Sequence, residues 1–228
     1  MTDPASADSA HATDPADDAP PGTLWARMKA DPQYAPEHLA LEAIRRLGPE
    51  AQRWTTRTRD AQPNLSPDAL AQLAIRRFTN LARLSGAVSG ATGLPGAVVD
   101  VGVLAWTQAR MVLHIAAAYG VDPTASERAA DLLVLQRVHK VAETARVALG
   151  VAAGRERASR LFAETGDRPL TGVIVRLGIK LAQMAGIRAA KRMFAKIVPG
   201  AAVVLGTWVN SAATRDLAKR ARELYATS

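Results

Sequence analysis

Four polar side chains lie on one face of an otherwise apolar segment near the middle of the chain. They are Asp100, Thr107, Arg110 and His114, and at ~100° per helical residue they fall within about 80° of one another. Asp100 and Arg110 are ten residues apart, about 15 Å along a helix axis, so they cannot pair with each other. Each therefore needs a partner from another helix, because an isolated buried charge is very costly.

Two interpretations of this polar stripe stay open. It is either a catalytic or ion-binding stripe, or a set of polar contacts that fixes the register of neighbouring helices, and we favour the second. The candidate partners of Asp100 are Arg176, Lys180 and Asn210.

The sequence lacks the common signatures of catalysis and metal binding. It has no cysteine, which excludes disulfides and thiolate metal sites. No two of its histidines stand one helical turn apart, and Walker and Rossmann glycine motifs are absent. The run Gly86–Gly90 has its serine at the wrong position for a Gly-x-Ser-x-Gly elbow. We therefore expect no catalytic residue, no cofactor and no metal. The histidines are His11, His38, His114 and His139.

Charge is distributed unevenly along the chain. Residues 1–22 carry five aspartates and no basic residue, so a net charge of +8 for the whole chain leaves +13 on the remainder. The near absence of apolar bulk in residues 1–22 predicts a disordered acidic tail, followed by one helical domain over residues 23–228. A body this basic attracts polyanions, either nucleic acid or the anionic face of a membrane, unless its arginines form only a solvated surface.

One basic cluster is a candidate contact for an anionic surface. Its members, on one side of a predicted helix, are Arg188, Lys191, Arg192 and Lys196. No helix-turn-helix pattern is evident, and aromatic residues make up only 4% of the chain, so few rings are available to stack on bases. The cluster suits anionic lipid headgroups equally well. We expect the partner to be an anionic membrane surface or a membrane protein complex rather than nucleic acid.

The elements that must position these residues are long helices joined at Gly/Pro corners. Hydrophobic residues make up 48% of the chain without β-type alternation, which favours an all-α fold. Small residues, including Gly86, Gly90 and Gly93, recur on one helix face, where they let a partner backbone approach closely. Pro95 and Gly96 then end this helix and open the next.

A second corner at Pro199-Gly200 mirrors the first at a constant offset of 104 residues, and the last helix should reach about Tyr225. The sequence thus predicts a helical bundle built from two long Gly/Pro-cornered helical hairpins. Trp106 and Trp208 follow the two corners at similar distances. Their rings lie at the headgroup level if the hairpin tips enter a bilayer, or they are core anchors.

Local signals in the first third of the chain predict the helix boundaries there. Pro36 with Glu37 indicates a helix start, and Gly48-Pro49 predicts a break before a second, more polar helix over residues 50–60. Ser66-Pro67-Asp68 combines a capping hydroxyl, a proline and an acid in the first turn, which is a strong start signal.

Similar signals follow the first hairpin. Thr124 with Glu127 predicts a capping box for one helix that reaches about Ala148. Gly150 and Gly154 should interrupt the chain before a short basic helix over residues 155–164.

Several motifs recur in a fixed order from about Ala35 to the end of the chain. They are the glycine-rich arm 85–93, Asp100, Arg110, the run Tyr119-Gly120-Val121-Asp122, Glu127-Arg128, the corner 196–201 and Asn210. In these motifs the chain resembles the EcsC family of bacterial proteins. That family is named for a partner of an ABC exporter system. The resemblance implies a helical, membrane-proximal and non-catalytic protein.

The expected function is therefore that of a non-enzymatic, membrane-associated accessory protein. No signal segment begins the chain, so we expect a cytoplasmic protein that is peripheral at the inner face of the cell membrane. The alternative is a soluble helical adaptor or a nucleic-acid-associated basic protein.

Overall fold

The computed structural model describes residues 20–88, 94–161 and 201–227, and these residues form helices and no strand. Within these ranges the side chains of residues 82–88, 94–100, 158–161 and 201–211 are not described. The all-α prediction is confirmed. In chain order the elements are α1 (Gly22–Ala30), the 3₁₀ helix η2 (Pro32–Tyr34), α2 (Ala35–Ala61), α3 (Pro67–Val88), α4 (Leu94–Ala118), α5 (Glu127–Leu135), α6 (Ala142–Leu161) and α9 (Ala201–Tyr225).

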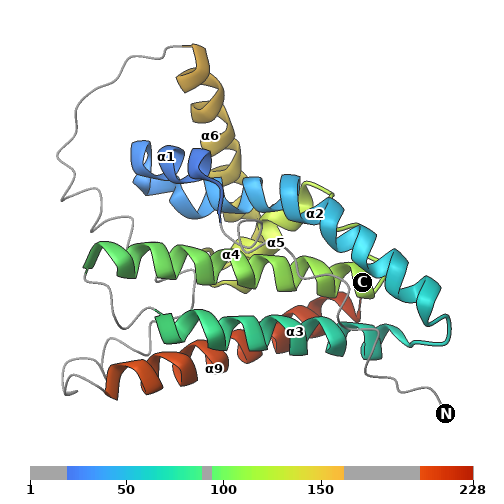
Figure 1. Ribbon diagram of the computed structural model, residues 1–228. Coiled ribbons are helices and arrows are strands. Elements are labelled where there is room, and N and C mark those ends of the chain that lie inside the picture. The colour runs from blue at the N-terminus through green and yellow to red at the C-terminus, as the bar shows by residue number, and fades with distance from the viewer. Residues whose placement is uncertain (1–19, 89–93, 162–200, 228) are drawn as a thin grey trace.

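Helix α4 is the centre of the fold, and α2, α3, α5 and α9 pack against it (Figure 1). Every residue from Leu104 to Ala118 is buried. A helix that is apolar on nearly all sides is stable in water only when neighbours cover all of them. The window Val101–Ala118 is also the one described segment long and apolar enough to cross a membrane, by length and composition only, and 89% of it is buried inside the protein.

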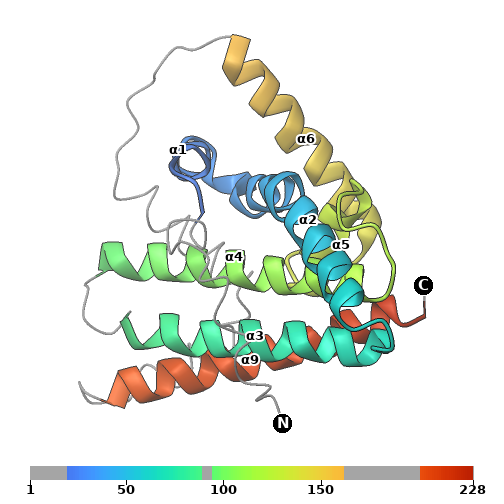
Figure 2. The same cartoon turned by 45° about the vertical axis from the view of Figure 1, so that its right-hand side comes forward.

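The other helices lie in two groups on opposite sides of α4. Helices α3 and α9 run side by side on one side, and α2 crosses the other, where α1, α5 and α6 join it (Figures 1 and 2). The C-terminal end of α3 and the N-terminal ends of α4 and α9 lie at the same end of the bundle (Figure 2).

The predicted Gly/Pro corners are only partly visible. Pro95 and Gly96 lie in the first turn of α4, as expected for a proline that opens a helix. The rest of the first corner, with Gly90 and Gly93, lies outside the described residues, and so do Pro199 and Gly200 of the second. Gly86 lies in the last turn of α3. The two-hairpin organisation therefore stays a prediction.

The predicted break at Gly48-Pro49 is wrong, because α2 runs without interruption from Ala35 to Ala61. Pro49 removes one backbone hydrogen bond, but burial of the flanking turns on α4 and α5 keeps the helix continuous. Gly48 serves a different purpose here. A Cβ at this position would lie 2.7 Å from the carbonyl oxygen of Pro123, so glycine allows the loop after α4 to touch α2.

The single helix predicted from Thr124 to about Ala148 is also wrong, since the chain forms α5 and α6 with a turn between them. At this turn Arg137 adopts a left-handed φ of 59°, and the amides of Val138 and His139 return to the carbonyl of Leu133. No glycine or proline marks the turn, so the sequence carries no local signal for it. The predicted interruption at Gly150 and Gly154 is wrong as well, because α6 continues through both to Leu161.

Two capping predictions have opposite outcomes. The start of α3 is confirmed: the hydroxyl of Ser66 accepts a hydrogen bond from the amide of Ala69 at 3.2 Å. The capping box of Thr124 is wrong, because Thr124 instead donates both its amide and its hydroxyl to the carboxylate of Asp122. Helix α5 begins three residues further on without a side-chain cap.

The tryptophans serve mainly as packing anchors in the described part of the chain. Trp106 is buried in the core, which decides against a headgroup position for its ring. The indole of Trp25 holds α1 against α4, where a Cβ at Gly102 would overlap it. Trp54 packs against the same core, and the side chain of Trp208 lies outside the description.

We predict that Gly48→Ala lowers the free energy of unfolding by about 1–3 kcal/mol, because its methyl group would push the backbone at Pro123 away from α2. Gly154→Ala is the matched control. A Cβ at Gly154 would meet no atom within 4 Å apart from its own helix backbone. Because alanine favours helix more than glycine does, this change should raise the free energy of unfolding by up to about 1 kcal/mol. Urea titrations of both variants measure the difference, and shifts of the same sign and size would contradict the close contact.

Candidate functional site

The described members of the polar stripe of α4 lie inside the bundle, where the buried guanidinium of Arg110 forms an ion pair with α2. Its Nε lies 2.8 and 2.9 Å from the two carboxylate oxygens of Glu50, and its Nη2 lies 2.7 Å from Oε1. The guanidinium also lies 5.8 Å from the ring centroid of Phe78 on α3. The expectation that Arg110 takes its partner from another helix is thus confirmed, and one side chain joins α4 to both neighbours.

His114, one turn further along α4, is fully buried beside this pair. Its Nδ1 donates to the carbonyl of Arg110 at 2.8 Å, and its ring packs between Trp54 and Phe78 at centroid distances of 5.1 and 4.8 Å. Burial, with the nearby positive charges of Arg110 and Arg77, lowers the pKa of His114 to about 3. The imidazole is therefore neutral at physiological pH and serves as packed structure.

Of the two remaining members of the predicted stripe, the structure describes the side chain of Thr107 but not that of Asp100. Thr107 is buried and its hydroxyl donates to the carbonyl of Val103 on its own helix at 2.9 Å. The side chain of Asp100 is outside the description, as are its candidate partners Arg176, Lys180 and Asn210.

Glu50 was not singled out by sequence reasoning. It directly follows Gly48-Pro49, where a break was expected, so its position relative to α4 was hidden by the wrong helix boundary. The sequence around it, with Arg53, Arg57 and Arg59 on the same predicted helix, gives no sign that its partner lies on α4.

A second polar contact joins the far ends of three helices. The hydroxyl of Tyr119 donates to Asp68 at 2.5 Å, and Arg222 reaches both, with its Nη2 3.0 Å from Asp68 and its Nε 3.3 Å from the hydroxyl. The hydrogen bonds from Tyr119 and Arg222 lower the pKa of Asp68, whereas burial and the bond to Asp68 raise the pKa of Tyr119. This contact holds the start of α3, the end of α4 and the end of α9 together.

Gly120 makes the position of Tyr119 possible. It adopts φ of +83°, and the next amide, of Val121, returns to the carbonyl of Ala116 at 3.0 Å, which closes the end of α4. The run Tyr119-Gly120, quoted for the family resemblance, is therefore a helix end that aims one hydroxyl at two other helices.

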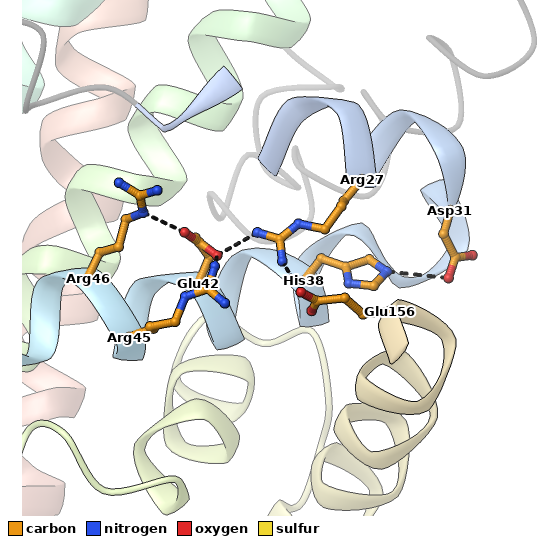
Figure 3. Close-up of polar contacts among 7 residues, drawn as sticks. All are labelled: Arg27, Asp31, His38, Glu42, Arg45, Arg46 and Glu156. Atoms are coloured by element: carbon orange, nitrogen blue, oxygen red, sulfur yellow. Dashed lines mark hydrogen bonds and ion pairs between the residues drawn. The ribbon is translucent and has the colours of Figure 1, made fainter. Parts of the chain in front are cut away.

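A third cluster, missed at the sequence level, joins α1, α2 and α6 (Figure 3). The fully buried carboxylate of Glu42 binds Arg27 of α1 at 2.5 Å and Arg46 at 2.5 Å, and it also contacts Arg45. Arg27 in turn binds Glu156 of α6 at 2.5 Å. Glu42 has arginines three and four residues further along its helix, a spacing that could have indicated the local part of the cluster.

Burial and charge act against each other in this cluster. Burial alone would raise the pKa of Glu42, but hydrogen bonds from Arg27 and Arg46 outweigh it and lower that pKa. Burial would likewise lower the pKa of Arg27, but Glu42 and Glu156 raise it. Both groups stay charged, so the cluster is a set of ion pairs that joins three helices.

Two histidine contacts extend this region. The Nε2 atom of His38 lies 3.3 Å from a carboxylate oxygen of Asp31 (Figure 3). Arg155 of α6 also binds Asp31, at 2.9 Å. His139, in the turn after α5, lies 2.7 Å from Glu37. These pairs connect the start of α2 to α1, to α6 and to the α5–α6 turn.

Each of these arrangements connects helices, and none resembles a metal site. Across the three described ranges, no group of three or more His, Asp or Glu side chains could hold a metal ion. The predicted anionic-surface cluster lies outside the described residues; its members are Arg188, Lys191, Arg192 and Lys196.

We predict that Glu50→Ala lowers the free energy of unfolding by about 3 kcal/mol, because it leaves the buried guanidinium of Arg110 without this carboxylate. Asp60→Ala removes an exposed carboxylate from the same helix and should change stability by less than about 0.5 kcal/mol. Chemical denaturation measures both. Equal, small effects would mean that the ion pair adds nothing to the packing of α2 on α4.

We also predict that His114 makes the protein less stable in mild acid. The pKa of His114 is depressed in the folded state, so its stabilisation is complete above the unfolded pKa of about 6.5 and is lost as the pH falls toward 3. At ~1.4 kcal/mol per pH unit, about 2 kcal/mol should be lost between pH 7 and pH 5. His114→Gln should remove that part of the pH dependence in urea titrations at the two pH values; an unchanged slope would contradict the prediction.

Comparison with known proteins places this helical framework in a family. A model of the EcsC protein family matches residues 51–227, from the middle of α2 to the end of α9, which is more than half of the chain. The matched range includes Arg110, Tyr119 and Gly120 of the contacts described above. No curated protein and no solved structure matches the chain. The chain therefore belongs to the EcsC family.

Proposed function

We propose that this EcsC-family protein is a non-enzymatic accessory protein that associates peripherally with the anionic, cytoplasmic face of the cell membrane. The observation that carries the proposal is the burial of α4. The described segment that is apolar enough to cross a bilayer is covered by other helices over 89% of its window. Contact with a membrane then falls to the surface of the domain, which is basic.

The buried charges support a structural role rather than catalysis. Arg110, Glu42 and Arg27 all bind side chains on a neighbouring helix. His114 is neutral and encased by aromatic rings. Groups held in this way stabilise the positions of helices, and Arg110, Glu42 and His114 have almost no exposed surface for a reactant.

The exposed charges support an anionic partner. Several exposed arginines make no ion pair with the described residues, whereas most described acids are engaged by arginine, histidine, tyrosine or threonine. These arginines include Arg53, Arg57, Arg76, Arg157 and Arg215. Each basic side chain near an anionic bilayer contributes about 1 kcal/mol, so a few of them acting together give stable but salt-sensitive adsorption.

Sedimentation with lipid vesicles tests the proposal. The purified chain should sediment with phosphatidylcholine vesicles that contain phosphatidylglycerol, but not with pure phosphatidylcholine, and high salt should release it. Absence of sedimentation at low salt would favour the soluble adaptor. Retention after both high-salt and carbonate washes would show an integral rather than a peripheral protein.

The hairpin tips would bind the membrane more deeply if they insert into the bilayer. Fluorescence of Trp208 can test this insertion. If the second tip enters the bilayer, bromine-labelled lipids should quench part of the tryptophan fluorescence, and quenching should persist at high salt. Trp208→Phe should remove that quenched component, because Trp106 is buried in the core. Quenching that high salt abolishes, or that Trp208→Phe leaves unchanged, would limit the association to surface adsorption.

A further inference from the structure

We infer that one exposed face of α2, carrying Arg46, Arg53 and Arg57, is a docking surface for the phosphate-bearing face of a lipid bilayer. We call this face the arginine stripe. The inference rests on the proposed function and assigns it to residues outside the basic cluster 188–196.

The three arginines form a straight line on the outside of the molecule. They are spaced seven and four residues apart, and at ~100° per residue they fall within about 40° of one another. The line is about 16 Å long. All three side chains are exposed, and the C-terminal half of α2 runs along the outside of the bundle, away from α1 (Figures 1 and 2).

The acids of α2 neutralise this face only in part. Glu42 is buried among Arg27, Arg45 and Arg46, and Glu50 is bound to Arg110. Arg46 is thus paired with Glu42, and Asp60, three residues after Arg57, is the exposed acid on this side of the helix. Arg53 and Arg57 make no ion pair or hydrogen bond with any described residue, so their guanidinium groups are available to an external anion.

The face of α2 opposite the arginine stripe packs against the core and holds the helix in position. Leu47, Ala51 and Thr55 are buried on the other side of α2, which packs on α4. Arg59 donates to the carbonyl of Ala118 at 2.9 Å and ties the end of α2 to the end of α4. The backbone that carries the arginines is therefore ordered before any partner binds, which lowers the entropic cost of association.

A lipid surface fits this stripe better than nucleic acid does. The phosphates of a bilayer surface lie in a plane, so they can contact guanidinium groups along the whole stripe at once. The phosphates of a nucleic-acid duplex follow a curved path away from a straight stripe. Among the described residues, the large hydrophobic side chains that are exposed include no aromatic ring, so a stacking platform for single strands is missing. The guanidinium fork matches phosphate oxygens in either case, so charge alone does not decide.

The test measures vesicle binding of the full chain with two matched pairs of substitutions. Arg53→Gln with Arg57→Gln removes two charges from the stripe. Arg146→Gln with Arg157→Gln removes two from exposed positions eleven residues apart on one face of α6. The probe is a phosphatidylcholine vesicle containing phosphatidylglycerol, at low salt, and circular dichroism melts verify that each variant is folded.

The stripe variant should bind these vesicles about 30-fold more weakly than the natural chain, and the α6 variant should change little. Arg53→Lys with Arg57→Lys should restore most of the binding, because a planar lipid surface needs the charge more than the fork.

Three results would overturn the inference, and they can be told apart. Equal losses in the two glutamine variants would mean that only net charge matters, and the proposed function would survive without the stripe. Loss of binding to duplex DNA with unchanged vesicle binding would make the stripe a nucleic-acid surface. Failure of the natural chain to bind vesicles at any salt would remove the proposed function and the stripe together.

Discussion

The structure depends on covering α4 completely while neutralising the charge in its middle. Arg110 lies in a helix whose every residue from Leu104 to Ala118 is buried, and an uncompensated guanidinium there would be very costly. Its carboxylate comes from Glu50, so α2 must cross α4 at that level. This requirement explains why α2 continues through Pro49 as one helix. It also explains Gly48, which lets the loop after α4 lie against α2 at the same point.

The same constraint determines which charged side chains of α2 are buried and which are exposed. Three of the four carboxylates of α2 face inward, where Glu37, Glu42 and Glu50 bind His139, Arg27 and Arg110 respectively. Arg53 and Arg57 then face solvent without an ion pair to any described residue, and Asp60 is the exposed acid near them. A chain with a net charge of +8 thus displays part of its positive charge on one face of a rigid helix. Adsorption to an anionic surface then depends on where the arginines lie on the fold as well as on the net charge of the chain.

The outer helices are held differently from the centre. Helix α1 joins the body partly through buried side chains such as Leu24 and Met28, but its links to α2 and α6 are ion pairs made by Arg27 and Asp31. Partly exposed ion pairs weaken as salt rises, whereas apolar burial does not. The contact of Tyr119, Asp68 and Arg222 has the same character at the far ends of α3, α4 and α9. Apolar packing thus attaches the outer helices to the core, and polar contacts join them to one another.

The sequence by itself determined the fold class, the family and those boundaries that have a local chemical cause. Ser66-Pro67 starts α3 because a hydroxyl cap and a proline act within one turn, and the apolar stretch 101–118 had to be covered because of its composition. Only the tertiary structure decided the rest. Whether Pro49 breaks a helix depends on the packing around it, and the turn at Arg137 has no local signal. The partner of Arg110 is a residue 60 positions away, and pairing at that range is set by how helices cross, which no local pattern encodes.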